Sequence, residues 1–231
     1  MVDAKAGLPT GVGLWAGFLD RVSASEAVAA ASEIESLGVN TIWLQEYSGV
    51  DPFVRAALYL NATDHLTVAL GVATIYGRDP EAMVAAASTL EEAFPGRFAL
   101  GLGVSHQQLV EKRGRDYASP LGAMRDYLAG MDATVKGRVL PGRFLGALGP
   151  KMVELAATST RGVHTYFCPV AHTDSVRATF GSSTWLAPTQ LVVTGAPDED
   201  WRGHVRPYLG LCLGMPNYRR SLARFGFTES D

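Results

Sequence analysis

The 231-residue chain is long enough for one large domain, and its 47% hydrophobic and 19% charged residues are typical of a globular protein. A net charge of −3 without any basic cluster argues against duplex nucleic acid as a partner. No apolar run reaches the roughly 18 residues that cross a bilayer, and no signal-peptide pattern opens the chain. The two cysteines fit no ligand spacing, and His164 and His172 lack a third ligand. We therefore expect a single domain over residues 1–231, soluble and cytoplasmic, without a metal site.

The first half of the chain alternates short apolar runs with helix-start signals. Strands are predicted over residues 12–17, 41–44, 66–74 and 98–104. Ser23 predicts one helix start, because Glu26 follows it at the spacing of a capping box. Three further helix starts are predicted where an N-cap residue precedes proline, at Asp51-Pro52, Asp79-Pro80 and Ser119-Pro120.

The second half continues the alternation less regularly. A helix is predicted over 121–131, a loop over 135–143, strands over 144–148, 163–167 and 190–194, a helix from 149 to 157, and a largely helical tail over 204–225. Strands separated by helices, with almost no hairpin signals, require parallel pairing and right-handed crossovers. Seven such units favour a (β/α) barrel over a doubly wound sheet, although periodicity alone does not separate the two.

The carboxyl ends of the strands are the expected ligand site in both architectures. Two strands that are one βα unit apart end in glycines, which suits backbone lying against a flat or phosphorylated ligand. A simple turn at the end of a strand is the alternative. The candidate binding residues at the strand ends are Trp15, Glu46, Gly71, Val72, Ala73, Thr74, Gly103, Val104, Ser105, His106, Leu148, Gly149, Pro150 and Lys151.

The chemistry of these ends favours a phosphorylated cofactor. Gly149-Pro150-Lys151 predicts an anion site, because a helix N-terminus and a lysine coincide, with a plain helix start as the alternative. Glu46 is a candidate acid–base or ring-contacting group, or else a structural residue. Nucleophile-elbow, Walker and complete dinucleotide motifs are absent. An apolar, glycine-rich and modestly cationic mouth suits a flat cofactor with a phosphorylated tail.

Nearly the whole chain resembles the luciferase-like monooxygenase superfamily, and within it the actinobacterial-type coenzyme F420-dependent oxidoreductases. The motifs that carry the resemblance keep their order along the chain, at residues 12–15, 37–46, 71–80, 98–106, 147–152, 162–164, 213–219 and 226–228.

This resemblance implies a TIM-type (β/α)8 barrel, hydride transfer between the deazaflavin F420 and a small organic substrate, and a homodimer. It implies a bulge in the third strand with a non-prolyl cis peptide bond at Gly71–Val72, and it places Thr74 near the ring. Residues 103–105 and 148–151 would hold the phosphate and ribityl portions. Glu46 falls where relatives have a ring-contacting or proton-handling residue, which makes it the catalytic candidate.

Relatives usually continue beyond the segment at 226–228 by a further βα unit. We therefore expect a barrel that lacks its last unit and exposes the edges of its first and seventh strands.

Two alternatives to the F420 enzyme stay open. One is an FMN-dependent monooxygenase on the same fold, and the other is a non-catalytic homologue that binds the cofactor or pairs with a full-length relative.

Overall fold

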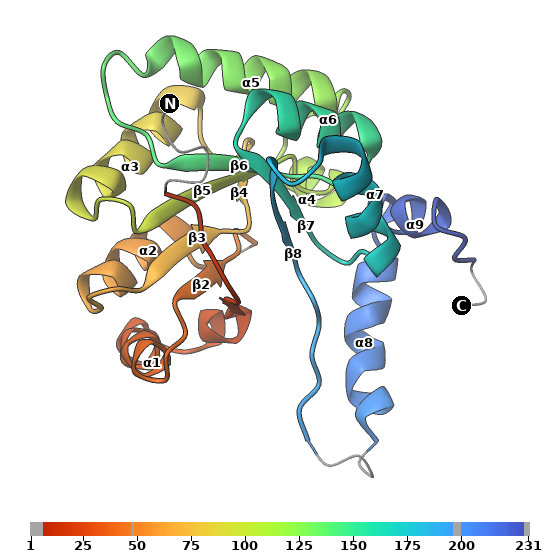
Figure 1. Cartoon of the computed structure of the whole chain (residues 1–231), viewed down its shortest axis with the longest axis horizontal. Coiled ribbons are helices and arrows are strands. Elements are labelled where there is room, and N and C mark those ends of the chain that lie inside the picture. Colours follow the sequence, from red (N-terminus) through yellow and green to blue (C-terminus); the bar gives the residue numbers. More distant parts are fainter. Residues whose placement is uncertain (1–6, 48, 196–199, 229–231) are drawn as a thin grey trace.

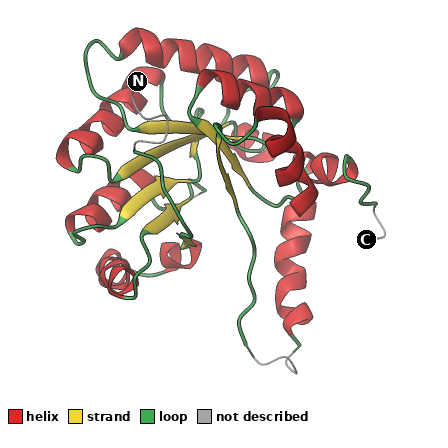
Figure 2. Cartoon of the chain, viewed as in Figure 1, coloured by secondary structure: helices red, strands yellow, loops and turns green. Residues whose placement is uncertain are grey.

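A curled parallel sheet runs through the molecule, and helices cover its outer face (Figures 1 and 2). The computed structural model describes residues 7–47, 49–195 and 200–228. The strands are β1 (Leu14–Trp15), β2 (Thr41–Leu44), β3 (Thr67–Leu70), β4 (Ala73–Thr74), β5 (Phe98–Gly103), β6 (Gly142–Gly146), β7 (Gly162–Thr165) and β8 (Trp185–Pro188). A 3₁₀ turn (Gly17–Arg21) precedes the helices α1 (Ala24–Ser36), α2 (Pro52–Asn61), α3 (Pro80–Ala93), α4 (Gln107–Lys112), α5 (Pro120–Thr134), α6 (Pro150–Ser159), α7 (Val170–Phe180), α8 (Trp201–Leu213) and α9 (Pro216–Ala223).

The order of the strands in space follows their order in the chain, β1-β2-β3-β5-β6-β7-β8, with β4 beside β5. A doubly wound sheet would reverse direction at a switch point, so this order identifies a (β/α) barrel. Within the described residues β1 pairs only with β2 and β8 only with β7, so the barrel is open. The prediction of a barrel without its last unit is confirmed. No helix in the described ranges has both the length and the apolar character needed to cross a bilayer.

The helices α1, α2, α3 and α5 begin at the predicted caps. The side chain of Ser23 accepts from Glu26 N, and the Glu26 carboxylate accepts from Ser23 N, which completes the capping box. Asp51 and Asp79 cap α2 and α3 through their carboxylates. The helix start predicted at Ser119-Pro120 is confirmed, since Ser119 is the N-cap of α5, but its side chain makes no capping hydrogen bond. The ψ of Ser119, 75°, departs from the extended cap geometry, so the hydroxyl does not reach the helix N–H groups.

The predicted strand over 190–194 is wrong, because the last strand is β8 at Trp185–Pro188. The indole of Trp185 is buried and donates to Pro9 O at 3.0 Å, which fixes this segment at the base of the barrel. Val192, by contrast, is 75% exposed and lies outside the sheet. The apolar run at 190–194 therefore does not mark a buried strand.

The third barrel strand is divided into β3 and β4 by a cis peptide bond at Gly71–Val72, as the resemblance implied. Ala69 lies opposite Ala99, whereas Ala73 lies opposite Leu102. Between these two pairs the third strand advances four residues and β5 advances three. The extra residue makes a β-bulge, which turns the side chain of Val72 toward the carboxyl end of the barrel.

Two glycines of β5 permit this bulge. A Cβ built on Gly101 would lie 2.0 Å from Leu70 O and 2.5 Å from the ring of Phe144. A Cβ on Gly103 would lie 2.3 Å from Cγ2 of Val72. The bulged strand therefore comes so close to β5 that a side chain at position 101 or 103 of β5 would not fit.

Successive residues of the strands divide between two cores. In β2, Ile42 and Leu44 pack in the large core between sheet and helices, whereas Trp43 joins a smaller cluster on the inner face. That inner cluster combines the small strand residues Ala69 and Ala99 with large side chains, namely Leu8, Trp43, Phe144 and Trp185. Small residues on β3 and β5 thus leave the volume that the aromatic rings fill.

We expect Gly101→Ala to lower the free energy of unfolding by about 1–3 kcal/mol, because the methyl group would collide with the backbone of β3. Gly210→Ala is the matched control, since a methyl group added there in α8 would have no neighbour within 4 Å. That change should stabilise the protein by roughly 0.5–1 kcal/mol through helix propensity. Urea unfolding followed by circular dichroism measures both, and equal stability of the two variants would contradict the close approach.

Candidate active site

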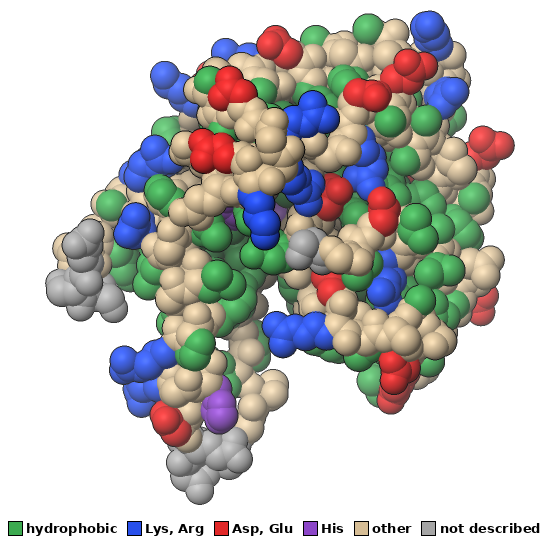
Figure 3. Space-filling view, turned by 180° about the vertical axis from the view of Figure 1, so that it is seen from behind, with side chains coloured by type: hydrophobic (Ala, Val, Ile, Leu, Met, Phe, Trp, Pro, Cys, Tyr) green, Lys and Arg blue, Asp and Glu red, His purple; other side chains and the backbone are tan. Residues whose placement is uncertain are grey.

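A cavity of about 610 Å³ opens at the carboxyl ends of the strands. The strand ends form one wall, and residues of α8 and α9 form the other. On the face seen in Figure 3, a projecting arm stands apart from the body of the molecule, and between them lies a hollow with hydrophobic side chains inside and Lys and Arg around it. A concavity of this size accommodates a cofactor together with a small substrate.

Most predicted binding residues line this one cavity. They are Trp15, Glu46, Gly71, Val72, Thr74, Gly103, Val104, Ser105, His106, Leu148 and Gly149. Ala73, Pro150 and Lys151 are not among the lining residues. Ala73 is buried in the core between sheet and helices, while Pro150 and Lys151 begin α6 with exposed side chains. The binding roles of all these residues stay predictions.

The wall at the bulge is flat and apolar. Val72 lies between two glycines, because a Cβ on Gly146 would be 3.1 Å from its side chain and one on Gly103 would be closer still. On the inner side, a Cβ on Gly71 would meet the rings of Trp15 at 2.9 Å and Trp43 at 3.0 Å. Since no side chain projects beside Val72, a planar ring can lie against this wall.

The turn after β5 also belongs to the cavity. Ser105 has a φ of 56°, a left-handed conformation that is uncommon for a residue other than glycine. Its carbonyl accepts a hydrogen bond of 3.2 Å from Tyr117 Oη. Burial raises the pKa of Tyr117 to about 12, so its hydroxyl keeps its proton and continues to hold this turn at neutral pH.

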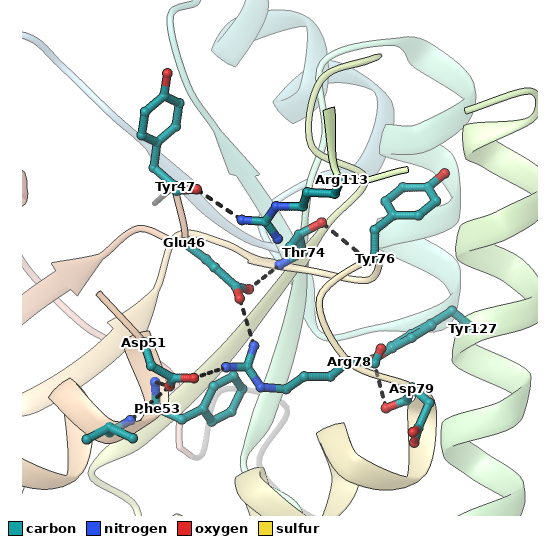
Figure 4. A network of polar contacts seen from close by, with 11 residues as sticks. Glu46, Tyr47, Asp51, Phe53, Thr74, Tyr76, Arg78, Asp79, Arg113 and Tyr127 are labelled. Atoms are coloured by element: carbon teal, nitrogen blue, oxygen red, sulfur yellow. Dashed lines mark hydrogen bonds and ion pairs between the residues drawn. The ribbon is translucent and has the colours of Figure 1, made fainter. Parts of the chain in front are cut away.

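Glu46 is held by two partners (Figure 4). One carboxylate oxygen accepts from Thr74 N at 2.8 Å, and the other accepts from the guanidinium of Arg78 at 2.8 Å. Arg78 also pairs with Asp51 and lies over the ring of Phe53, 4.5 Å from its centroid. The side chains of Glu46 and Arg78 are only 10% and 16% exposed.

The carboxylates around Arg78 stabilise the charge of its guanidinium. Burial by itself would lower the pKa of Arg78, but the hydrogen bond and charge of Glu46, together with Asp51, outweigh it and raise the pKa. Because both oxygens of Glu46 are engaged, its contacts favour a positioning role for the bulged strand. The acid–base role of Glu46 stays a prediction.

The tail carries no site role in the sequence-based predictions, yet α8 and α9 contribute much of the cavity wall. His106 and Asn217 are joined by a hydrogen bond of 2.9 Å between Nδ1 and Oδ1. The ring of Tyr218 packs against those of His106 and Phe167. Burial lowers the pKa of His106, and the bond to Asn217 opposes the shift. The motif at 213–219 is visible in the sequence, but nothing local to it indicates this contact.

The tail also makes the cavity cationic. Arg21, Arg220 and Arg224 line it, and none of them has an ion pair among the described residues. Glu46 is the only acidic side chain among the lining residues, and Arg78 already neutralises it. The guanidinium of Arg224 comes within 3.7 Å of a Cβ built on Gly149, which is the N-cap of α6. Arginine and a helix N-terminus together form an environment suited to an anion.

The family model of the luciferase-like monooxygenases matches residues 6–183. The chain belongs to this family. A relative in Mycobacterium tuberculosis, whose name proposes it as a coenzyme F420-dependent oxidoreductase, is 27% identical over 266 residues. The match covers 91% of this chain and 74% of that protein.

Solved structures share the fold at low sequence identity. An F420-dependent secondary alcohol dehydrogenase, in complex with an F420–acetone adduct, aligns with a TM-score of 0.66 at 14% identity, over 78% of this chain and 68% of its own. The oxygenating component of a diketocamphane monooxygenase from Pseudomonas putida, in complex with FMN, aligns with a TM-score of 0.65 at 13% identity, over 88% and 74%. These similarities support the open-barrel description of the fold.

We expect Glu46→Gln to lower the free energy of unfolding by about 1–3 kcal/mol, because it leaves the charge of buried Arg78 partly uncompensated. Asp132→Asn is the matched control, since Asp132 pairs with Arg143 through a side chain that is mostly exposed. That surface pair should contribute less than about 1 kcal/mol. Denaturant titration at pH 7 compares the two, and equal losses would contradict the positioning role.

Proposed function

We propose that this protein is an oxidoreductase that uses coenzyme F420 to transfer a hydride to or from a small organic substrate. The observation that carries the proposal is a cavity lined both by the glycine-flanked bulge at Val72 and by Arg220 and Arg224, which have no ion pair among the described residues. The name of the mycobacterial relative and the F420 dependence of the structurally similar alcohol dehydrogenase support the choice of cofactor.

The residues present fit this cofactor. The flat apolar wall at Val72 suits a planar tricyclic ring, and the arginines suit its phosphorylated, carboxylate-bearing tail. When bound, the deazaflavin supplies a ring carbon that gives up or takes a hydride. The protein would contribute by holding the ring against the bulge and by lining the opposite side of the cavity with α8 and α9.

Tyr166 is a second candidate for a polar contact with the substrate, beside the predicted acid–base residue Glu46. Tyr166 lines the cavity, with its ring 4.9 Å from that of Trp15. Burial raises its pKa to about 12, so its hydroxyl is a hydrogen-bond donor rather than a base at neutral pH. In that role it holds a proton at Oη and can orient a substrate carbonyl or hydroxyl.

The FMN-dependent monooxygenase is the second candidate, favoured by the fold that it shares with the FMN-bound Pseudomonas enzyme. A protein that binds cofactor without turnover is the third.

We also propose a cytoplasmic homodimer. Support for the dimer comes from the outer edges of β1 and β8, which pair with no further strand in the described part of the chain, and from exposed apolar side chains at Leu191, Val192 and Leu211. Light scattering after size-exclusion chromatography measures the oligomeric state.

Titration with F420 and with FMN separates the candidates. At one hundred times its dissociation constant, a bound cofactor should stabilise the fold by about 2.7 kcal/mol, seen as an increase in Tm. We expect this increase with F420, together with oxidation of reduced F420 when a carbonyl substrate is added. Stabilisation by FMN alone, with oxygen-dependent turnover, would favour the monooxygenase. The absence of stabilisation by either cofactor would overturn the proposal.

Arg220→Ala and Arg224→Ala should each weaken F420 binding roughly tenfold, because each removes a cation that faces the cofactor's anionic tail. Arg202→Ala is the control, since Arg202 belongs to the same tail but lies over Trp201 outside the cavity lining. Fluorescence titration at two salt concentrations measures the effect, and salt should weaken wild-type binding more than that of the variants. Equal affinities for all three variants would contradict a cationic tail site.

A further inference from the structure

His164 is a buried polar side chain that the proposed mechanism does not use. It lies on β7 and is 3% exposed. Its ring stacks on Trp43 at 4.7 Å and on Trp15 at 5.7 Å, with Phe144 meeting it edge-on. An imidazole packed so completely among aromatic rings has one orientation, so the direction of each ring nitrogen is fixed.

The two ring nitrogens have different surroundings. Nδ1 lies 2.9 Å from Ala187 O on the neighbouring strand. Because a carbonyl only accepts, Nδ1 carries the proton of the neutral ring and Nε2 carries the lone pair. Nε2 is fully buried and has no hydrogen-bond partner among the described residues. Burial lowers the pKa of His164 to about 4 against the opposing bond to Ala187, so the ring is neutral at ordinary pH.

Nε2 of His164 lies beside Gly71, at the inner end of the cavity. A Cβ built on Gly71 would lie 3.2 Å from Nε2, and Gly71, Trp15 and His164 all line the cavity. His172 offers a comparison, since it is also buried with one nitrogen bonded to a carbonyl and the other without a described partner. Its ring, however, packs on Phe225 and does not line the cavity. Of these two buried histidines, only His164 combines a nitrogen without a described partner with a place in the cavity lining.

We propose that Nε2 of His164 accepts a hydrogen bond from an N–H or O–H group of the ligand and thereby selects ligands that present a neutral donor beside Gly71. An unpaired acceptor in such a site disfavours both carboxylates and purely apolar groups. The assignment rests on the proposed function for the identity of the donor. It is either the imide N–H of the deazaflavin ring or the hydroxyl of an alcohol substrate.

Three variants distinguish the proposed hydrogen bond between Nε2 and the ligand from the hydrogen bond between Nδ1 and Ala187 O. His164→Asn retains an N–H that can reach Ala187 O and removes the acceptor. His164→Gln places an amide oxygen near the position of Nε2 and should restore part of the binding. His164→Phe keeps the aromatic stack and removes both nitrogens. A purely structural histidine would predict that Asn is the best replacement for ligand binding, whereas the proposal predicts that Gln is.

The first arm of the test uses F420 and its imide-methylated derivative, which lacks the N–H donor. Fluorescence titration of the wild type should show roughly 10- to 100-fold tighter binding of F420, the effect of one buried hydrogen bond. This preference should disappear in His164→Asn and His164→Phe. In ¹⁵N-histidine-labelled protein, F420 should shift the Nε2 resonance of His164 upfield, and the methylated derivative should not. A preference that persists in the Asn variant would overturn the assignment to the ring.

The second arm tests the hydroxyl source with propan-2-ol and acetone on the F420-loaded protein. Only the alcohol should shift the Nε2 resonance, and the wild type should bind it more tightly than His164→Asn does. A third pair, phenol and anisole, is added to the protein without any cofactor, so it remains informative if F420 does not bind. A shift with phenol alone would support the acceptor even when the proposed function fails. No shift from any donor in the three pairs would overturn the proposal.

Discussion

The close approach of the bulged third strand to β5 is the constraint on which the rest of the structure depends. Gly101 and Gly103 have no side chain to meet the third strand, so Leu70 O and the side chain of Val72 can approach β5, and pairing with β5 resumes at Ala73. The apolar wall of the cavity and the inner position of Gly71 both follow from this contact. A side chain at either glycine of β5 would displace the wall against which a flat ligand lies.

Polar and aromatic contacts hold the bulge from opposite sides. On the outer side, the carboxylate of Glu46 bonds the backbone of Thr74 and the guanidinium of Arg78. On the inner side, Trp15 and Trp43 pack directly against Gly71. Because one ion pair and one aromatic cluster converge on a short segment, the stability of the fold and the shape of the site depend on the same residues.

The barrel and the tail each form a different part of the cavity wall. The strand ends supply backbone and apolar surface, whereas α8 and α9 supply the unpaired Arg220 and Arg224 and the bond from Asn217 to His106. An open edge between β1 and β8 gives the tail space beside the barrel. Two of the three arginines that line the site, Arg220 and Arg224, therefore come from a part of the chain that follows β8.

The sequence by itself determined the parallel βα alternation, most helix starts and the glycines at the strand ends, since capping, turn and periodicity signals act within a few residues. The family resemblance added the barrel and the bulge at Gly71–Val72. Only the tertiary structure decided that Glu46 pairs with Arg78, 32 residues away, and that His106 meets Asn217 after 111 residues. It also decided which nitrogen of His164 keeps its lone pair. Such contacts depend on how elements that are distant in the sequence pack together, and local sequence patterns do not predict that packing.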